Sequence, residues 1–122
     1  MMEENGVDLH GQAVAIVDDD LAVRDSTRLL LELNGIAVQA YQSGREFLQA
    51  IPSVACLILD YHMPGMTGLE LVSELRRRGF SAPTIMLTAT TDPTIERRAA
   101  ALGITQILRK PTEIGEIRQT LL

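Results

Sequence analysis

Several groups that could do chemistry follow short apolar runs in this chain. Three consecutive carboxylates, Asp18–Asp20, follow the first run, and Asp60 follows a later one. Thr88 and Lys110 stand at the ends of two further runs. Carboxylates held close together repel one another unless a cation lies between them or their pKa values rise. Because the set offers oxygen ligands with no cysteine or histidine side chain, it predicts a site for Mg²⁺ or Mn²⁺.

Such a site is suited to phosphoryl transfer. Mg²⁺ neutralises phosphate oxygens during this reaction. Lys110 would add a fixed positive charge and Thr88 a hydroxyl donor. A carboxylate that is not needed to hold the metal can act as a nucleophile, which would give an aspartyl phosphate.

The apolar runs alternate with helical patterns along the chain. Each run is rich in β-branched residues and is followed by a segment with helical spacing and capping signals. The expected strands are 13–17, 36–41, 54–59, 83–87 and 104–109. Strands that are apolar on both faces are typical of parallel strands covered by helices. The pattern therefore predicts an α/β fold with a doubly wound (βα)5 open parallel sheet, in which ligands gather beyond the carboxyl ends of the strands.

Local signals predict where the helices begin and end. Asp20 is expected to cap the first helix, which should end at Asn34-Gly35. Ser43 with Glu46 three residues later predicts a capping box. The run Arg76–Arg78 is expected to lie in solvent near a helix C-terminus, where it complements the helix dipole. One broad apolar face is expected on the first helix, formed by Val23, Leu29, Leu30 and Leu33.

The length and composition indicate one domain. The 122 residues leave no room for a second core, and we expect 1–11 to be a flexible N-terminal lead-in and 12–122 to form the domain. The net charge of −5 argues against direct contact with nucleic acid. No apolar run reaches the roughly 20 residues of a membrane span, so no membrane contact is expected. A lone cysteine, Cys56, excludes an internal disulfide, and a cytoplasmic location is the default expectation.

The motifs at the strand ends resemble those of the receiver domain of two-component response regulators. They are Val17-Asp18-Asp19, the segment 59–68 (Leu-Asp-Tyr-His-Met-Pro-Gly-Met-Thr-Gly), Leu87-Thr88-Ala89 and Lys110-Pro111. The resemblance extends from Ala13 to the expected last helix. It implies a flavodoxin-like sheet order of 2-1-3-4-5, which would put the first and third strands side by side.

The resemblance also implies a role for each site residue. Asp60 resembles the phosphoacceptor, which takes a phosphoryl group from the phosphohistidine of a histidine kinase or histidine phosphotransfer protein. Thr88 and Lys110 would bind phosphoryl oxygens, with the Lys110–Pro111 peptide in the cis form. The implied metal ligands are Asp18, Asp19, Asp60 and the backbone carbonyl of His62. The domain would catalyse only its own phosphorylation and dephosphorylation, and an output domain or a hybrid kinase could lie outside this chain.

Two positions differ from the family pattern, and two alternative functions stay open. Ile107 and Thr112 stand where many receivers carry an aromatic residue, so the aromatic part of the family's switch is missing. One alternative is a small phosphatase of the haloacid-dehalogenase type, because Asp18-x-Asp20 imitates the paired aspartates of that family. The other is a receiver-like interaction module that is never phosphorylated.

Overall fold

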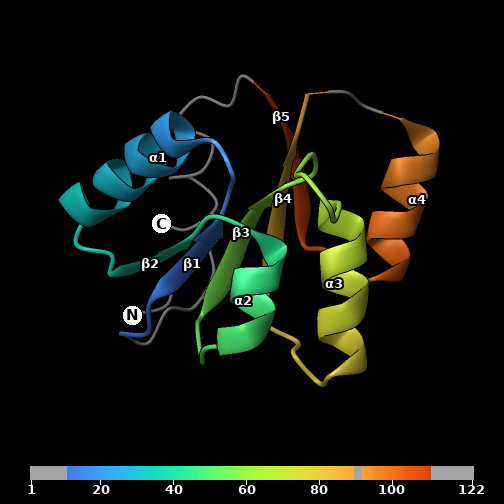
Figure 1. Ribbon diagram of the computed structural model, residues 1–122, viewed down its shortest axis with the longest axis horizontal. Coiled ribbons are helices and arrows are strands. Elements are labelled where there is room, and N and C mark those ends of the chain that lie inside the picture. Colours follow the sequence, from blue (N-terminus) through green and yellow to red (C-terminus); the bar gives the residue numbers. More distant parts are fainter. Residues whose placement is uncertain (1–10, 90–91, 111–122) are drawn as a thin grey trace.

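Strands and helices alternate along the chain in the computed structural model, which describes residues 11–89 and 92–110. Five strands and four helices form this part of the molecule (Figure 1). The strands are β1 Val14–Val17, β2 Val38–Tyr41, β3 Cys56–Asp60, β4 Thr84–Thr88 and β5 Gln106–Arg109. The helices are α1 Leu21–Leu33, α2 Gly44–Ala50, α3 Gly68–Arg77 and α4 Pro93–Ala101. The expected last helix and most of the expected lead-in lie outside the described residues, and the division at residue 11 stays a prediction.

The strands form one parallel sheet in the order β2-β1-β3-β4-β5. This confirms the doubly wound fold and its flavodoxin-like order. β1 lies directly beside β3, with Val17 opposite Leu59. Because both strands end at the same edge, the residues that follow Val17 and Leu59 are brought together there.

Alternate residues of the strands pack against helices on opposite faces of the sheet. Val14 and Ile16 belong to a core cluster that includes Leu31 of α1. Ala15 and Val17 belong to a larger cluster with the apolar side chains of α2, α3 and α4. Figure 1 shows the same layers, with α1 on one side of the sheet and the other three helices on the opposite side. The continuous apolar runs therefore reflect burial on both faces.

The expected apolar face of α1 is wrong at two of its four residues, Leu29 and Leu33, whereas Val23 and Leu30 are half-buried. Leu29 and Leu33 are 59% and 75% exposed, whereas Thr27 and Leu31 are the buried residues of this helix. Residues four positions apart lie on one helix face, and a residue midway between them points away from it. Since Thr27 and Leu31 face the sheet, Leu29 must face away from it.

The helix caps follow the sequence signals closely. Asp20 and Asp92 accept hydrogen bonds from backbone N–H groups in the first turns of α1 and α4. Ser43 accepts from the N–H of Glu46, which is one half of the expected capping box. A complete capping box forms at the start of α3, where Thr67 and Glu70 exchange side-chain to backbone hydrogen bonds.

The arginine run at the end of α3 divides into two kinds of residue. Arg77 and Arg78 pair with Glu74 at the surface, as expected for solvated side chains. Arg76 does not fit that expectation, because its half-buried guanidinium donates to the carbonyls of Leu102 at 2.9 Å and Phe80 at 3.0 Å. Arg76 therefore links the end of α3 to the end of α4.

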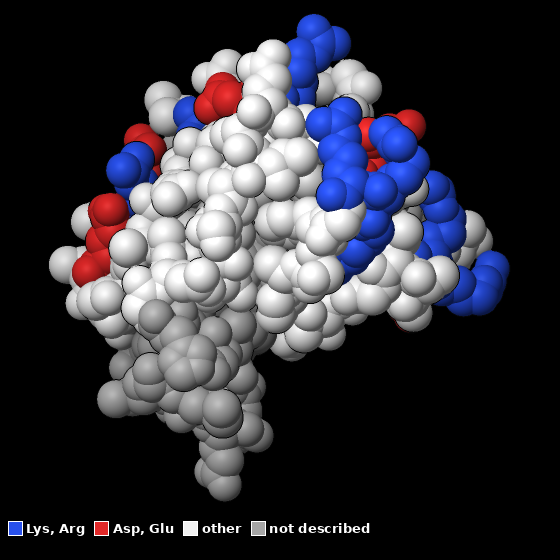
Figure 2. Space-filling view, turned by 90° about the horizontal axis from the view of Figure 1, so that it is seen from below, with Lys and Arg blue, Asp and Glu red and all other residues white. Residues whose placement is uncertain are grey.

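Figure 2 shows Lys and Arg side chains gathered on one side of the molecule's lower face.

Candidate functional site

The edge at which the strands end carries the groups singled out in the sequence. Asp60 and Thr88 are the last residues of β3 and β4, and Asp18 and Lys110 directly follow β1 and β5. The ladders continue past the strand ends: the Asp18 N–H donates to the Tyr41 carbonyl at 3.1 Å, and the Lys110 N–H donates to the Thr88 carbonyl at 2.7 Å. The sheet register therefore fixes the backbone from which these side chains project.

Three carboxylates meet at this edge. One oxygen each from Asp18, Asp19 and Asp60 lies within 4.8 Å of the others. Asp18 and Asp60 are only 2% and 5% exposed, while Asp19 is open to solvent. An all-oxygen set with one open side suits a hard cation that keeps part of its water shell. The donor chemistry and spacing therefore fit the divalent ion that the sequence predicts.

Asp18 is electrostatically unfavourable in its charged form. Burial raises the pKa of its carboxyl group above the ordinary value, and the negative charges of Asp60 and Asp19 raise this pKa further. A hydrogen bond from the Asp20 N–H at 2.9 Å and the Lys110 ammonium act in the opposite direction. A bound cation would relieve this repulsion.

Lys110 supplies the positive charge of the site. Its Nζ lies 3.0 Å from Oδ2 of Asp60, and the two side chains are 26% and 7% exposed. Thr88 ends β4, which lies between β3 and β5, and it is 1% exposed. The edge thus combines three carboxylates, an ammonium and a hydroxyl, which is a set that can hold a phosphoryl group beside a carboxylate.

Two positioning features escaped the sequence reasoning. Gly68 begins α3 against the end of β3: a Cβ there would lie 2.8 Å from the Asp60 carbonyl oxygen, and its N–H donates to the Tyr61 carbonyl at 2.8 Å. Arg24 donates from Nη1 to the Asp18 carbonyl at 2.6 Å. Gly68 was visible only as part of a loop motif, and nothing in the sequence connected Arg24 with Asp18.

Other residues singled out in the sequence lie apart from the carboxylates. The carboxylate of Asp20 accepts from the N–H groups of Ala22 and Val23 and so caps α1, which weakens the Asp18-x-Asp20 pattern as a catalytic pair. The exposed His62 ring contacts the Tyr61 ring edge-on, with centroids 4.8 Å apart. The carbonyl of His62 as a metal ligand stays a prediction, and Pro111 lies outside the described residues.

Comparison with known proteins identifies relatives. A family model described as the response regulator receiver domain matches residues 14–122. Transcriptional regulatory protein FixJ of Azorhizobium caulinodans is 41% identical over 106 residues, which cover 85% of this chain and 50% of that protein. Response regulator MprA of Mycolicibacterium vanbaalenii is 39% identical over 108 residues, which cover 85% of this chain and 46% of that protein. The chain thus spans about half the length of these relatives.

Solved structures share the fold. The chemotaxis protein CheY4 of Vibrio cholerae superposes with a TM-score of 0.82 at 30% identity, covering 88% of this chain and 93% of that one. The crystal structure of FixJ-N gives a TM-score of 0.80 at 34% identity and covers 88% of each chain. These matches do not favour a haloacid-dehalogenase-like phosphatase. No helix in residues 11–89 and 92–110 is long and apolar enough to cross a membrane. With the family model spanning the sheet and the carboxylate cluster at its edge, this chain belongs to the response regulator receiver domain family.

Proposed function

We propose that this receiver accepts a phosphoryl group on Asp60 and thereby switches a partner or output surface. The observation that carries the proposal is the convergence of Asp18, Asp19 and Asp60 within 4.8 Å, with the Lys110 ammonium 3.0 Å from Asp60. The donor would be the phosphohistidine of a histidine kinase or histidine phosphotransfer protein. A carboxylate oxygen of Asp60 forms a bond to phosphorus while the phosphorus–nitrogen bond of the donor breaks, and the electron pair leaves with the imidazole.

Each neighbouring residue has a part in this reaction. Asp18, Asp19 and the backbone carbonyl of His62 would hold Mg²⁺ or Mn²⁺ together with Asp60. When bound, the ion neutralises the phosphoryl oxygens during transfer. Lys110 leaves its direct contact with the carboxylate to hold one phosphoryl oxygen, and Thr88 donates its hydroxyl to another. The chemistry of this chain is limited to its own phosphorylation and dephosphorylation.

The switch would use the segment that links Thr88 to α4. Ile107 is partly buried and packs against the core cluster on the α3 and α4 side of the sheet, opposite Met86 in the register. Because no aromatic ring stands at this position, movement of Thr88 toward a bound phosphoryl group would act through the backbone after β4. The relatives include transcriptional regulatory proteins, and we propose a transcriptional output for the protein to which this receiver belongs.

Mass spectrometry tests the proposal directly. Acetyl phosphate with Mg²⁺ should add about 80 Da, the mass of one phosphoryl group in this covalent step, as an acid-stable and base-labile adduct. Asp60→Asn should abolish the adduct. Asp20→Asn is the matched control, because its carboxylate caps α1 and asparagine caps equally well. Absence of the adduct on the wild-type chain with fresh donor would contradict the proposal.

A further inference from the structure

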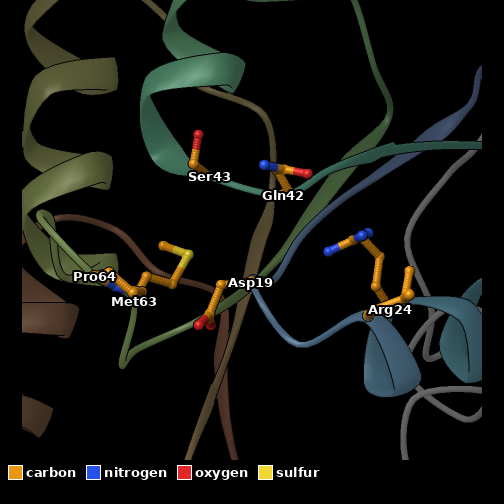
Figure 3. A pocket seen from close by; sticks show the side chains of 7 residues that line it. Asp19, Arg24, Gln42, Ser43, Met63 and Pro64 are labelled. Atoms are coloured by element: carbon orange, nitrogen blue, oxygen red, sulfur yellow. The ribbon is translucent and has the colours of Figure 1, made fainter.

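A cavity of about 430 Å³ opens beside the carboxylate cluster. It lies between the segments that follow β1, β2 and β3 (Figure 3). Asp19 belongs both to the cluster and to the cavity wall. The cavity therefore begins where the phosphoryl site ends. The remaining wall residues are Leu21, Arg24, Gln42, Ser43, Met63 and Pro64.

Hydrogen-bond donors line one part of this wall. Figure 3 shows the Arg24 guanidinium pointing toward the interior, with Gln42 and Ser43 on the neighbouring loop. The bond from Arg24 to the Asp18 carbonyl at 2.6 Å fixes the guanidinium in this orientation and uses only one of its five N–H groups. Within the described part of the chain, the Gln42 amide has no hydrogen-bond partner.

Apolar groups line the rest of the wall. Met63 is 8% exposed, and Leu21, at 60%, is one of the exposed large hydrophobic residues of the molecule. Pro64 completes this side of the cavity. A cation, an amide and a short apolar surface fit a small carboxylate whose charged end meets the guanidinium and whose carbon chain contacts the apolar side.

We propose that this cavity is a subsite for the leaving group of a small acyl phosphate donor, an inference that rests on the proposed phosphorylation of Asp60. A carboxylate oxygen of Asp60 forms a bond to phosphorus while the bond between phosphorus and the bridging oxygen of the donor breaks. The electron pair stays on that oxygen, so the product is a carboxylate and no proton is transferred. Arg24 meets the negative charge that develops on the departing carboxylate, and Gln42 donates to its second oxygen.

Two donors that differ in their leaving group isolate this subsite. Acetyl phosphate releases acetate, which can bind Arg24 and Gln42. Phosphoramidate releases ammonia, which has neither a negative charge nor an apolar part. The experiment measures the initial rate of the 80 Da adduct, about the mass of one phosphoryl group, with each donor. The ratio of the acetyl phosphate rate to the phosphoramidate rate then reports on the leaving group alone.

The variants are Arg24→Gln and Gln42→Ala, with Arg28→Gln as the matched control. Arg28 lies one turn further along α1, is exposed, and pairs with Glu32 at 3.4 Å. In Arg24→Gln the rate ratio should fall about tenfold, because a charge-assisted hydrogen bond to the leaving group is lost. A smaller fall is expected in Gln42→Ala, and Arg28→Gln should keep the wild-type ratio.

The outcomes separate this inference from the function on which it rests. An unchanged ratio in both Arg24→Gln and Gln42→Ala, with phosphoramidate still labelling the chain, overturns the subsite and leaves the phosphoacceptor intact. If neither donor labels the wild-type chain, both proposals are overturned. If Arg24→Gln loses its circular dichroism spectrum, Gln42→Ala decides, since no described hydrogen bond depends on that amide.

Discussion

Replacing Gly68 with alanine should disturb both the fold and the position of Asp60, the proposed phosphoacceptor. The added Cβ would lie 2.8 Å from the Asp60 carbonyl oxygen, 3.0 Å from Leu59 Cδ1 and 3.1 Å from Tyr61 Cα. Two of these three atoms belong to the backbone, so relief requires the end of β3 to move away from α3. Overpacking of this kind costs about 1–3 kcal/mol, and the higher helix propensity of alanine offsets less than about 1 kcal/mol of that.

The expected net loss of stability is about 1–2 kcal/mol, or about 4–8 °C in Tm. A carbonyl displacement of about 0.5 Å also displaces the Asp60 carboxylate, and we expect the rate of labelling by acetyl phosphate to fall about tenfold. Thermal unfolding followed by circular dichroism measures the first effect. Mass spectrometry of the adduct over time measures the second.

Gly44→Ala is the matched control for this prediction. Gly44 is also the buried first residue of a helix, but its added Cβ would meet Met66 Sδ at 3.0 Å. A flexible thioether can move aside, so the Tm should stay within about 2 °C of the wild-type value. If Gly68→Ala matches the wild-type chain in both Tm and labelling rate, the close approach of α3 does not position Asp60.

Three further predictions concern charge and burial. Lys110→Met should slow labelling of Asp60 by acetyl phosphate about 10²-fold, because the variant loses the ammonium group that lies 3.0 Å from Asp60. The circular dichroism spectrum should stay unchanged. An unchanged labelling rate would exclude Lys110 from the reaction. Asp18→Asn should raise the Tm measured without divalent ions, because it removes a buried charge that Asp60 and Asp19 repel. The same variant should also lose the increase in Tm that we expect Mg²⁺ to give the wild-type chain. If Mg²⁺ stabilises the variant as much as the wild-type chain, Asp18 is not a ligand. Burial raises the pKa of the Cys56 thiol to about 12, so iodoacetamide should alkylate the native chain only slowly at pH 8. The rate should increase as the pH rises toward that pKa, because the thiolate is the reactive form. Rapid alkylation at pH 8 without denaturant would contradict this prediction.

The fold and the placement of carboxylate, hydroxyl and ammonium groups at strand ends could be predicted, because both depend on short-range sequence patterns. The apolar runs were long enough to mark strands buried on both faces, and capping residues such as Asp20 and Asp92 marked helix starts. The boundaries moved by one or two residues: the last expected strand, 104–109, begins at Gln106. The prediction of a divalent metal rests on residue type alone, because carboxylates without cysteine or histidine leave few choices of metal, and the structure adds that the three carboxylates lie close together.

Side-chain direction was less predictable. The sequence of α1 contains several leucines, and the apolar face predicted for this helix wrongly includes Leu29 and Leu33. The rotation of a helix about its axis is set by the sheet on which it packs, and the local sequence does not show this. Arg76 could not be separated from Arg77 and Arg78, since its partners are carbonyls 4 to 27 positions away in the chain. Neighbours in the sequence thus have different environments when only one of them faces another element.

The sequence by itself determined which groups could react and that parallel strands would carry them to one edge, because residue type and alternation are local properties of the chain. Only the tertiary structure decided that three carboxylate oxygens lie within 4.8 Å of one another, that Lys110 reaches Asp60, and that α3 packs closely against the end of β3 at Gly68. These distances depend on strand register and helix packing between segments far apart in the chain. The Arg24 cavity beside Asp19 likewise exists only where the first turn of α1 and the segments that follow β2 and β3 come together.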